Sequence, residues 1–420
     1  MKTIKLGIVG LGTVGTGVVR IIQNNQQKIL ATSGCQLQIK TIVVANLAKQ
    51  RHVDLAGIKL TNHIADIVND DEIQIVIDVM GTIEPAKAYI EALLDRGKNV
   101  ITANKDLLAT YGNELIAHAQ ENHVNLLYEA SVAGGIPILR TIATSFAADQ
   151  ITSVAGIING TSNYILTQMS ENGLTYNEAL QQAKELGLAE TDPTNDVSGK
   201  DAAYKMAILT QFAFGVTVPL ENIFMMGITQ ITKADILRAQ KWGYVIKLIG
   251  QARPVDDKLS VSVEPMFVPK DHPLATIKNE NNAVLVTGSS VGEVMFYGAG
   301  AGELPTANSV LSDVLATVKD LQLHQTGEKF NNFSRTTDLV VPQQQKDHYF
   351  LTLVSKDEAR VTLTPNHHKH QQIHSKQKNN LATELSYKTK SISVQQFRTM
   401  IEKLKSTEKL TMTAAYPVLD

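Results

Sequence analysis

The chain has very little cysteine, no excess of charge of one sign and no long apolar run. Its 420 residues include a single cysteine, Cys35, which excludes an internal disulfide and fits a reducing compartment. The net charge of −2 argues against a nucleic-acid or anionic-membrane partner. No apolar run reaches the roughly 18 residues of a membrane helix, and no signal-peptide layout opens the chain. We therefore expect a cytoplasmic protein without nucleic-acid or membrane partners.

Hydrophobic residues make up 43% of the chain and charged residues 19%, which is enough to build a large core. Short apolar runs alternate with segments of helical spacing in the first part of the sequence. Strands are predicted at residues 4–9, 37–45, 73–79, 99–103 and 124–128, and helices at 13–23, 85–96 and 113–122. This alternation predicts an α/β fold with a doubly wound parallel sheet.

The pattern changes after residue 150. A strand is predicted at 151–158, mixed short strands and turns at 260–300, and helices at 164–170, 177–186, 198–214 and 306–321. Ser198 and Asp201 have the spacing of a capping box at the start of the third helix. Residues 343–345 look like a polar linker, 348–420 like a small separate α/β module, and 367–380 like a solvated loop.

These patterns predict three domains. The first covers residues 1–130 and receives the helix at 306–330, the second covers 131–305, and the third covers 346–420.

A glycine-rich turn follows the first strand and opens the first helix. Glycines allow a tight turn and close backbone approach, and a helix N-terminus offers free N–H groups to a pyrophosphate. We therefore expect a dinucleotide site over Gly10, Leu11, Gly12, Thr13, Val14 and Gly15.

The second strand ends without the acidic residue that would bind the adenosine ribose of NAD. Lys49 and Arg51 follow instead. They either meet the 2′-phosphate of NADP or are two solvated loop cations. The sequence favours NADP and leaves NAD open.

Thr102-Ala103-Asn104-Lys105 lies at the carboxyl end of a predicted strand, where open α/β sheets bind ligands. Lys105 is therefore a candidate for contact with the nicotinamide ribose or with a substrate carboxylate. The alternative is a surface lysine at a helix start.

Acidic and basic side chains crowd residues 186–205. The carboxyl groups belong to Glu190, Asp192, Asp196 and Asp201, and the ammonium groups to Lys200 and Lys205. Such a cluster can hold a small zwitterion and transfer a proton, although Asp201 and Lys205 alone could be a surface pair one helical turn apart. With the glycine turn, the cluster indicates a dehydrogenase that acts on a small amino-acid-like substrate.

Six ordered blocks resemble the homoserine dehydrogenase family, from Gly10 to about Asp313. They are 10–15, 102–105, 128–137, 159–164, 190–205 and 297–306. The resemblance implies NAD(P)-linked reduction of L-aspartate 4-semialdehyde to L-homoserine, a step toward threonine and methionine. It also implies a homodimer formed through the middle domain, with a tetramer as the alternative.

The resemblance also assigns roles to individual residues. Lys205 becomes the general acid/base, with Lys105 as the rival proton donor. Asp201 is expected to act with them in catalysis by holding Lys205 and the substrate. The other assignments are substrate binding by Glu190, Asp196, Gly160, Thr161 and Lys105, cofactor contact by Thr102, Lys105 and Gly302, and a monovalent cation, usually sodium, at Glu129, Val132, Gly134 and Ile136.

Many members of the family end in a threonine-sensing ACT domain, and residues 348–420 stand in its place. A strand at 349–355 and a helix at 394–404 suit that fold. Lys356-Asp357-Glu358-Ala359-Arg360 replaces the expected glycine turn, and Pro365 and the histidines at 367–370 suit a helix poorly. We expect a degenerate ACT-like α+β module. The histidines are expected to lie in a solvated loop, and metal binding is the alternative interpretation.

Three other functions fit less well. A phosphorylating aldehyde dehydrogenase needs a thiolate nucleophile, and Cys35 precedes the second strand, away from the expected site. An NADP sensor would not need a placed acid such as Lys205. A fused aspartate kinase is not expected, because the chain begins at the cofactor strand.

Overall fold

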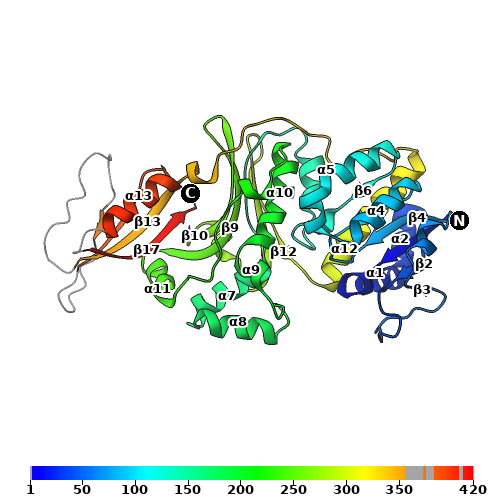
Figure 1. The fold of residues 1–420 in the computed structure, drawn as a ribbon, viewed down its shortest axis with the longest axis horizontal. Helices are drawn as coiled ribbons and strands as arrows, with labels where there is room; N and C mark the ends of the chain where they lie inside the picture. The colour runs from blue at the N-terminus through cyan, green and yellow to red at the C-terminus, as the bar shows by residue number, and fades with distance from the viewer. Residues whose placement is uncertain (1, 356–371, 375–382, 406–409, 420) are drawn as a thin grey trace.

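A computed structural model describes residues 2–355, 372–374, 383–405 and 410–419, which form two β-sheets with their helices. The N-terminal sheet lies at one end of an elongated molecule, the middle sheet at its centre and the C-terminal strands at the other end (Figure 1). No helix in the described ranges is long and apolar enough to cross a membrane.

The N-terminal sheet has six parallel strands in the order β3-β2-β1-β4-β5-β6. This is the order of a doubly wound dinucleotide-binding sheet, so the predicted fold class is confirmed. The strands are β1 Lys2–Val9, β2 Cys35–Val43, β3 Lys59–Thr61, β4 Ile73–Asp78, β5 Asn99–Thr102 and β6 Leu126–Leu127.

Helices cover both faces of this sheet, which explains why its strands are almost continuously apolar. Ile4, Leu6 and Ile8 pack on the side of α1, and Val76 and Val100 pack on the side of α4 and α5. The helices of this part are α1 Thr13–Asn24, α2 Gln26–Ser33, α3 Ala65–Val68, α4 Ala86–Asp95 and α5 Lys105–Glu121.

Helix α12 (Glu303–Leu323) returns to the N-terminal sheet after the middle sheet is complete. A Cβ atom on Gly17 of α1 would lie 2.5 Å from the Glu303 carbonyl oxygen and 2.9 Å from the Ala307 Cβ. The two helices therefore touch through backbone at a position where only glycine fits.

The middle sheet is mixed, and helices α7 and α10 pack on the face that carries Val154 and Val263. Its path runs β12-β11-β7-β9-β10-β17-β13-β15-β14, with β8 beside β10 and β16 beside β13. The strands up to the linker are β7 Ile151–Ile157, β8 Phe224–Met225, β9 Tyr244–Val255, β10 Lys258–Pro269, β11 Asn281–Gly288 and β12 Gly292–Ala299. The helices are α6 Ile138–Ser145, α7 Gly160–Glu171, α8 Tyr176–Glu185, α9 Thr194–Val197, α10 Lys200–Phe214 and α11 Lys233–Lys241.

The C-terminal strands are connected to the middle sheet, so the module expected at 348–420 does not have a sheet of its own. Strand β17 (Leu410–Val418) pairs with β10 in parallel at Val418 and Phe267, and β13 (Lys346–Ser355) follows it. The remaining elements are β14 Gln372–His374, β15 Thr383–Lys388, β16 Ile392–Ser393 and α13 Val394–Lys405. Strand β14 also contradicts the predicted loop at 372–374. The rest of 367–380, the 356–360 turn and Pro365 lie outside the described residues.

Other elements differ from the sequence prediction in length or position. Residues 260–300 form long strands, because β9 with β10 and β11 with β12 pair as antiparallel hairpins. Helix α5 begins earlier, at Lys105, and strand β6 has only two residues. Helix α2 and strand β3 had no prediction.

The predicted capping box at Ser198 and Asp201 is also wrong. Helix α10 begins after Gly199, which has a φ of +87°, and no side chain caps its N-terminus. The left-handed glycine turns the chain into the helix, so the carboxylate of Asp201 is free for other partners.

Candidate active site

The glycine turn between β1 and α1 brings the backbone very close to the neighbouring strand. Gly10 has a φ of +102°, and a Cβ there would lie 2.8 Å from the Val79 carbonyl oxygen. A Cβ on Gly15 would lie 2.4 Å from the Gly10 carbonyl oxygen. Both positions therefore require glycine for the turn itself.

Gly12 differs, because a Cβ at this position would meet no protein atom within 4 Å. It is the N-cap of α1, whose first turn has neither a side-chain cap nor an acidic residue. Leu11 is buried under the turn, Thr13 is exposed and Val14 is half-buried. Open space before uncapped N–H groups fits a dinucleotide pyrophosphate.

The two cations after β2 have different surroundings. The Arg51 guanidinium donates to the carbonyl oxygens of Asn46, Leu47 and Lys49, so it closes its own loop. Lys49 is exposed. Only Lys49 leaves its whole charged group available to a ligand.

The side chain of Thr102 turns inward. Its hydroxyl donates to Asp78 Oδ2 at 2.8 Å and accepts the backbone N–H of Asn104 at 3.1 Å. Burial raises the pKa of Asp78 to about 6, against the hydrogen bonds from Thr102 and Met80. Thr102 therefore shapes the loop that carries Lys105, and its side chain is not open to a ligand.

Lys105, Asp201 and Lys205 meet between the N-terminal and middle sheets. Lys205 Nζ donates to Asp201 Oδ2 at 2.7 Å and to the Ile158 carbonyl oxygen at 2.8 Å. Lys105 Nζ lies 3.2 Å from the other oxygen, Asp201 Oδ1. One carboxylate thus holds two ammonium groups, one from α5 and one from its own helix, α10. The predicted pairing one helical turn apart is confirmed.

Asn159, to which the sequence analysis assigned no individual role, organises this cluster. Its Nδ2 donates to Asp196 Oδ1 at 2.8 Å and to Asp201 Oδ2 at 2.9 Å. Its Oδ1 accepts the backbone N–H of Ser162 and so caps α7. The available signal was an amide side chain after a strand and at a helix N-cap.

The charges in the cluster depend on one another. Burial alone would raise the pKa of Asp201, but Lys205, Lys105 and the amide of Asn159 outweigh it and lower that pKa to about 2. For Lys105, burial opposes the charged form, yet Asp201 and Asp106 give a raised pKa. Burial raises the pKa of Asp196, with Asp201 adding repulsion. Asp201 therefore stays ionised at neutral pH.

The remaining predicted substrate residues, Gly160, Thr161 and Glu190, differ in the contacts that they make. Gly160 opens α7, and a Cβ there would lie 2.6 Å from the Glu280 carbonyl oxygen. The Thr161 hydroxyl donates to the Leu188 carbonyl oxygen at 2.6 Å. Glu190 is exposed, and within the described chain its carboxylate has no hydrogen bond or ion pair. A free carboxylate is what an incoming ammonium group requires.

A sharp turn connects η1 (Glu129–Ser131) to α6. Ala133 and Gly134 both have positive φ, and a Cβ on Gly134 would lie 2.4 Å from the Gly300 carbonyl oxygen. The Gly302 φ of +120° starts α12 beside this turn. The Val132 and Ile136 side chains are buried in the core. The turn and the glycine loop before α12 are therefore in direct backbone contact.

The carboxylate of Glu129 lies beneath this turn and is 1% exposed. It accepts the backbone N–H groups of Leu139 and Arg140, each at 2.8 Å. In the described ranges it has no ion pair, because Arg140 pairs with Asp313. Burial raises the pKa of Glu129. Glu129 thus places a buried carboxylate, whose oxygens can act as ligands, beside a sharply bent stretch of backbone.

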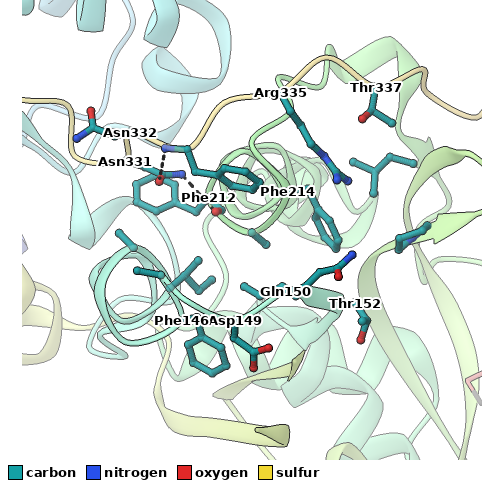
Figure 2. A pocket seen from close by; sticks show the side chains of 18 of the residues that line it. Phe146, Asp149, Gln150, Thr152, Phe212, Phe214, Asn331, Asn332, Arg335 and Thr337 are labelled. Carbon is teal, nitrogen blue, oxygen red and sulfur yellow. Dashed lines mark hydrogen bonds between the residues drawn. The ribbon is translucent and has the colours of Figure 1, made fainter. Parts of the chain in front are cut away.

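A hollow of about 710 Å³ elsewhere in the described protein does not contain this cluster. It lies at the opposite end of α10, beside Phe212 and Phe214, where Arg335 and Gln150 surround it (Figure 2). Fifteen residues of α10 separate the ends, or about 22 Å of helix. Proton transfer needs ionisable side chains such as the two lysines and the carboxylate of the cluster. The cluster is therefore a better candidate active site than the hollow at the other end of α10.

Two family models together match residues 10–129 and 137–315 of the chain. The model "Homoserine dehydrogenase, NAD binding domain" matches residues 10–129, and the model "Homoserine dehydrogenase" matches residues 137–315. The chain belongs to the homoserine dehydrogenase family. It has homoserine dehydrogenase activity and is an NAD(P)-dependent oxidoreductase of amino-acid biosynthesis. The family and activity predicted from the sequence are confirmed.

Relatives support this membership over most of the length. Homoserine dehydrogenase of Bacillus subtilis is 47% identical over 85% of this chain and 83% of its own. That of Lactococcus lactis is 45% identical over 84% of this chain and 83% of its own. The solved Thiobacillus denitrificans homoserine dehydrogenase has a TM-score of 0.90 at 32% identity, covering 100% of this chain and 99% of its own. A hyperthermophilic archaeal homoserine dehydrogenase, solved in complex with NADPH, has a TM-score of 0.63 at 25% identity, covering 76% and 98%.

Proposed function

We propose that Lys205 is the general acid/base of the homoserine dehydrogenase reaction. A nicotinamide cofactor, when bound, supplies the hydride donor or acceptor for C4 of the substrate. The oxygen on C4 then needs a proton in reduction and must lose one in oxidation. The ammonium of Lys205 is held by Asp201 and the Ile158 carbonyl oxygen, so its third N–H direction is left for that oxygen. This contact set is the observation that carries the proposal.

We propose that Asp201 positions both lysines and that Lys105 assists from the N-terminal domain. The 3.2 Å contact between Lys105 Nζ and Asp201 Oδ1 joins the two domains at the site. Glu190 would bind the substrate ammonium, because its carboxylate has no partner in the described protein. Asp196 and the N-terminal turn of α7 at Gly160 and Thr161 would complete the substrate site.

We propose NADP as the preferred cofactor, with NAD as the alternative. The glycine turn leaves space for a pyrophosphate at Gly12, with Thr102 and Gly302 shaping the loops on the nicotinamide side. Lys49 is the exposed cation that a 2′-phosphate would meet. The NADPH complex of the archaeal relative supports the same choice.

We propose a sodium ion at the turn of residues 129–136. Sodium prefers oxygen ligands, and Glu129 offers a buried carboxylate without an ion pair in the described chain. Main-chain carbonyl groups of Val132, Gly134 and Ile136 would complete the set. The cation would offset the cost of a buried negative charge.

We also propose the wider organisation predicted from the sequence. The domains would cover 1–130, 131–305 and an ACT-like 346–420, in a homodimer formed through the middle domain or in a tetramer. The single cysteine, Cys35, supports a cytosolic location.

The proposed cofactor and cation can be tested by following nicotinamide absorbance during homoserine oxidation. We expect a higher kcat/KM with NADP⁺ than with NAD⁺, and a lower rate when sodium is replaced by tetramethylammonium. Equal kcat/KM for both cofactors would remove the NADP preference, and a rate indifferent to sodium would remove the cation.

Replacing Asn159 by aspartate is expected to lower kcat by about 100-fold, because misplacing reacting groups by about 1 Å has that cost. Aspartate retains an oxygen for the α7 cap but cannot donate to Asp196 and Asp201. The measurement is kcat and its pH profile, which a role limited to capping would leave unchanged.

Thr175→Ala is the matched control for loss of a helix cap. Thr175 caps α8 through a capping box and does not contact the cluster. It should lose about 1 kcal/mol of stability and keep its kcat. A normal kcat and pH profile in Asn159→Asp would show that the amide only caps α7.

A further inference from the structure

A hollow of about 550 Å³ lies beside α7, on the middle domain. Thr167 and Glu171 of α7, Lys247 of β9, and Lys270, Thr276 and Lys278 of the following segments line it. Three of these side chains are lysines and one is an acid. Lys278 Nζ pairs with Glu171 Oε1 at 2.5 Å, so the positive charges of Lys247 and Lys270 remain in surplus.

Lys247 is unusual because it is 4% exposed and yet has no ion pair in the described chain. Its Nζ donates to Asn163 Oδ1 at 3.0 Å and to the Ile277 carbonyl oxygen, both of them neutral acceptors. Burial lowers its pKa to about 8. An ammonium has three N–H donors, so one donor is left at the wall of the hollow. A buried charge of this kind is costly without a counter-ion.

We propose that this hollow binds a small oxyanion, a molecule carrying a phosphoryl group or a pair of carboxylates, at Lys247, Lys270 and Lys278. Lys247 would supply the desolvated contact at the base, where a charge-assisted hydrogen bond is strong. The two lysines on the rim would supply attraction that salt screens. Nothing in the hydride-transfer chemistry uses these three side chains.

The hollow is connected to the candidate active site through Asn163. The amide Nδ2 of Asn163 donates to the carbonyl oxygens of Asn279 and Asn281, at 2.8 and 3.1 Å. The Glu280 carbonyl oxygen between them lies where a Cβ of Gly160 would be 2.6 Å away. An anion that draws on Lys247 would therefore act on the loop beneath the first turn of α7. This coupling rests on the proposed function, whereas the binding does not.

The test is calorimetric titration of inorganic phosphate, and separately of malonate, into the full chain saturated with NADP⁺ at constant ionic strength. Saturation keeps the probes from the cofactor's own phosphate sites. We expect Lys247→Met to weaken binding at least tenfold. The rim double variant Lys270→Gln with Lys278→Gln should do the same and keeps the buried lysine, so it decides the matter if Lys247→Met fails to fold.

Lys319→Gln, an exposed lysine on α12 away from the hollow, is the matched control and should bind like the unchanged protein. Tighter phosphate binding would assign a phosphoryl ligand, and tighter malonate binding a dicarboxylate. Equal affinity in all the variants, or no heat in the unchanged protein, would overturn the site. Because no turnover is measured, neither result bears on the dehydrogenase assignment.

Discussion

Replacing Lys205 by methionine is expected to lower kcat for homoserine oxidation by about 10²- to 10⁴-fold, the usual contribution of a placed acid or base. Methionine retains the length and the apolar stem of lysine but cannot accept or donate the proton. The cofactor Kd should stay within about twofold, since Lys205 is bound to Asp201 and Ile158 and not to the glycine turn. Stopped-flow absorbance and cofactor titration measure the two quantities.

Lys200→Met is the matched control on the same helix. Lys200 is exposed, and its ammonium lies 5.7 Å from the Tyr204 ring, away from Asp201. Its kcat should be close to that of the unchanged chain. Lys105→Met separates the rival donors, because a positioning role predicts a raised KM and an unchanged pH profile of kcat. If Lys105→Met lost the basic limb of the pH profile while Lys205→Met kept it, the two roles would be exchanged.

The N-terminal sheet was predictable because its signals are local. A buried parallel strand gives a short apolar run, and a glycine turn announces the next helix. The pairing of Asp201 with Lys205 was equally accessible, since side chains four residues apart share one helix face. The pairing of Lys105 with Asp201 was not accessible in the same way, because it joins helices α5 and α10, whose paired residues are almost a hundred positions apart in the chain.

The errors follow from contacts that a sequence pattern does not carry. The capping box failed because Gly199, with its φ of +87°, is the N-cap of α10, one residue after Ser198, which was expected to cap the helix. The role of Asn159 depends on two carboxylates far along the chain. The connection of the C-terminal strands to the middle sheet depends on the edge pairing of Val418 with Phe267, which are 151 residues apart in the chain. Edge strands leave unpaired N–H and C=O groups, so such an extension is favourable and leaves no sequence mark.

Replacing Gly12 by alanine is expected to raise the Kd for NADP⁺ about 10- to 100-fold while leaving the stability of the cofactor-free protein unchanged. The methyl group meets no protein atom within 4 Å, and the Gly12 φ of −87° is ordinary for alanine. It would instead occupy the space in which a pyrophosphate approaches the N–H groups of α1. Losing one charge-assisted hydrogen bond costs about 1.5–3 kcal/mol, which corresponds to that range of affinity.

The matched control for Gly12→Ala is Gly112→Ala in α5. A Cβ there would lie 3.9 Å from the Leu108 Cβ, an ordinary contact, so alanine should be neutral or slightly stabilising within a helix and should leave the NADP⁺ Kd unchanged. Thermal unfolding and cofactor titration of the two variants separate a folding effect from a binding effect. A Gly12→Ala protein with the original Kd would mean that the pyrophosphate does not approach this turn. In that case the uncapped N-terminus of α1 would need another explanation. Gly10 and Gly15 are required by the turn itself, whereas a Cβ on Gly12 would meet no protein atom within 4 Å, so the turn alone does not require glycine there.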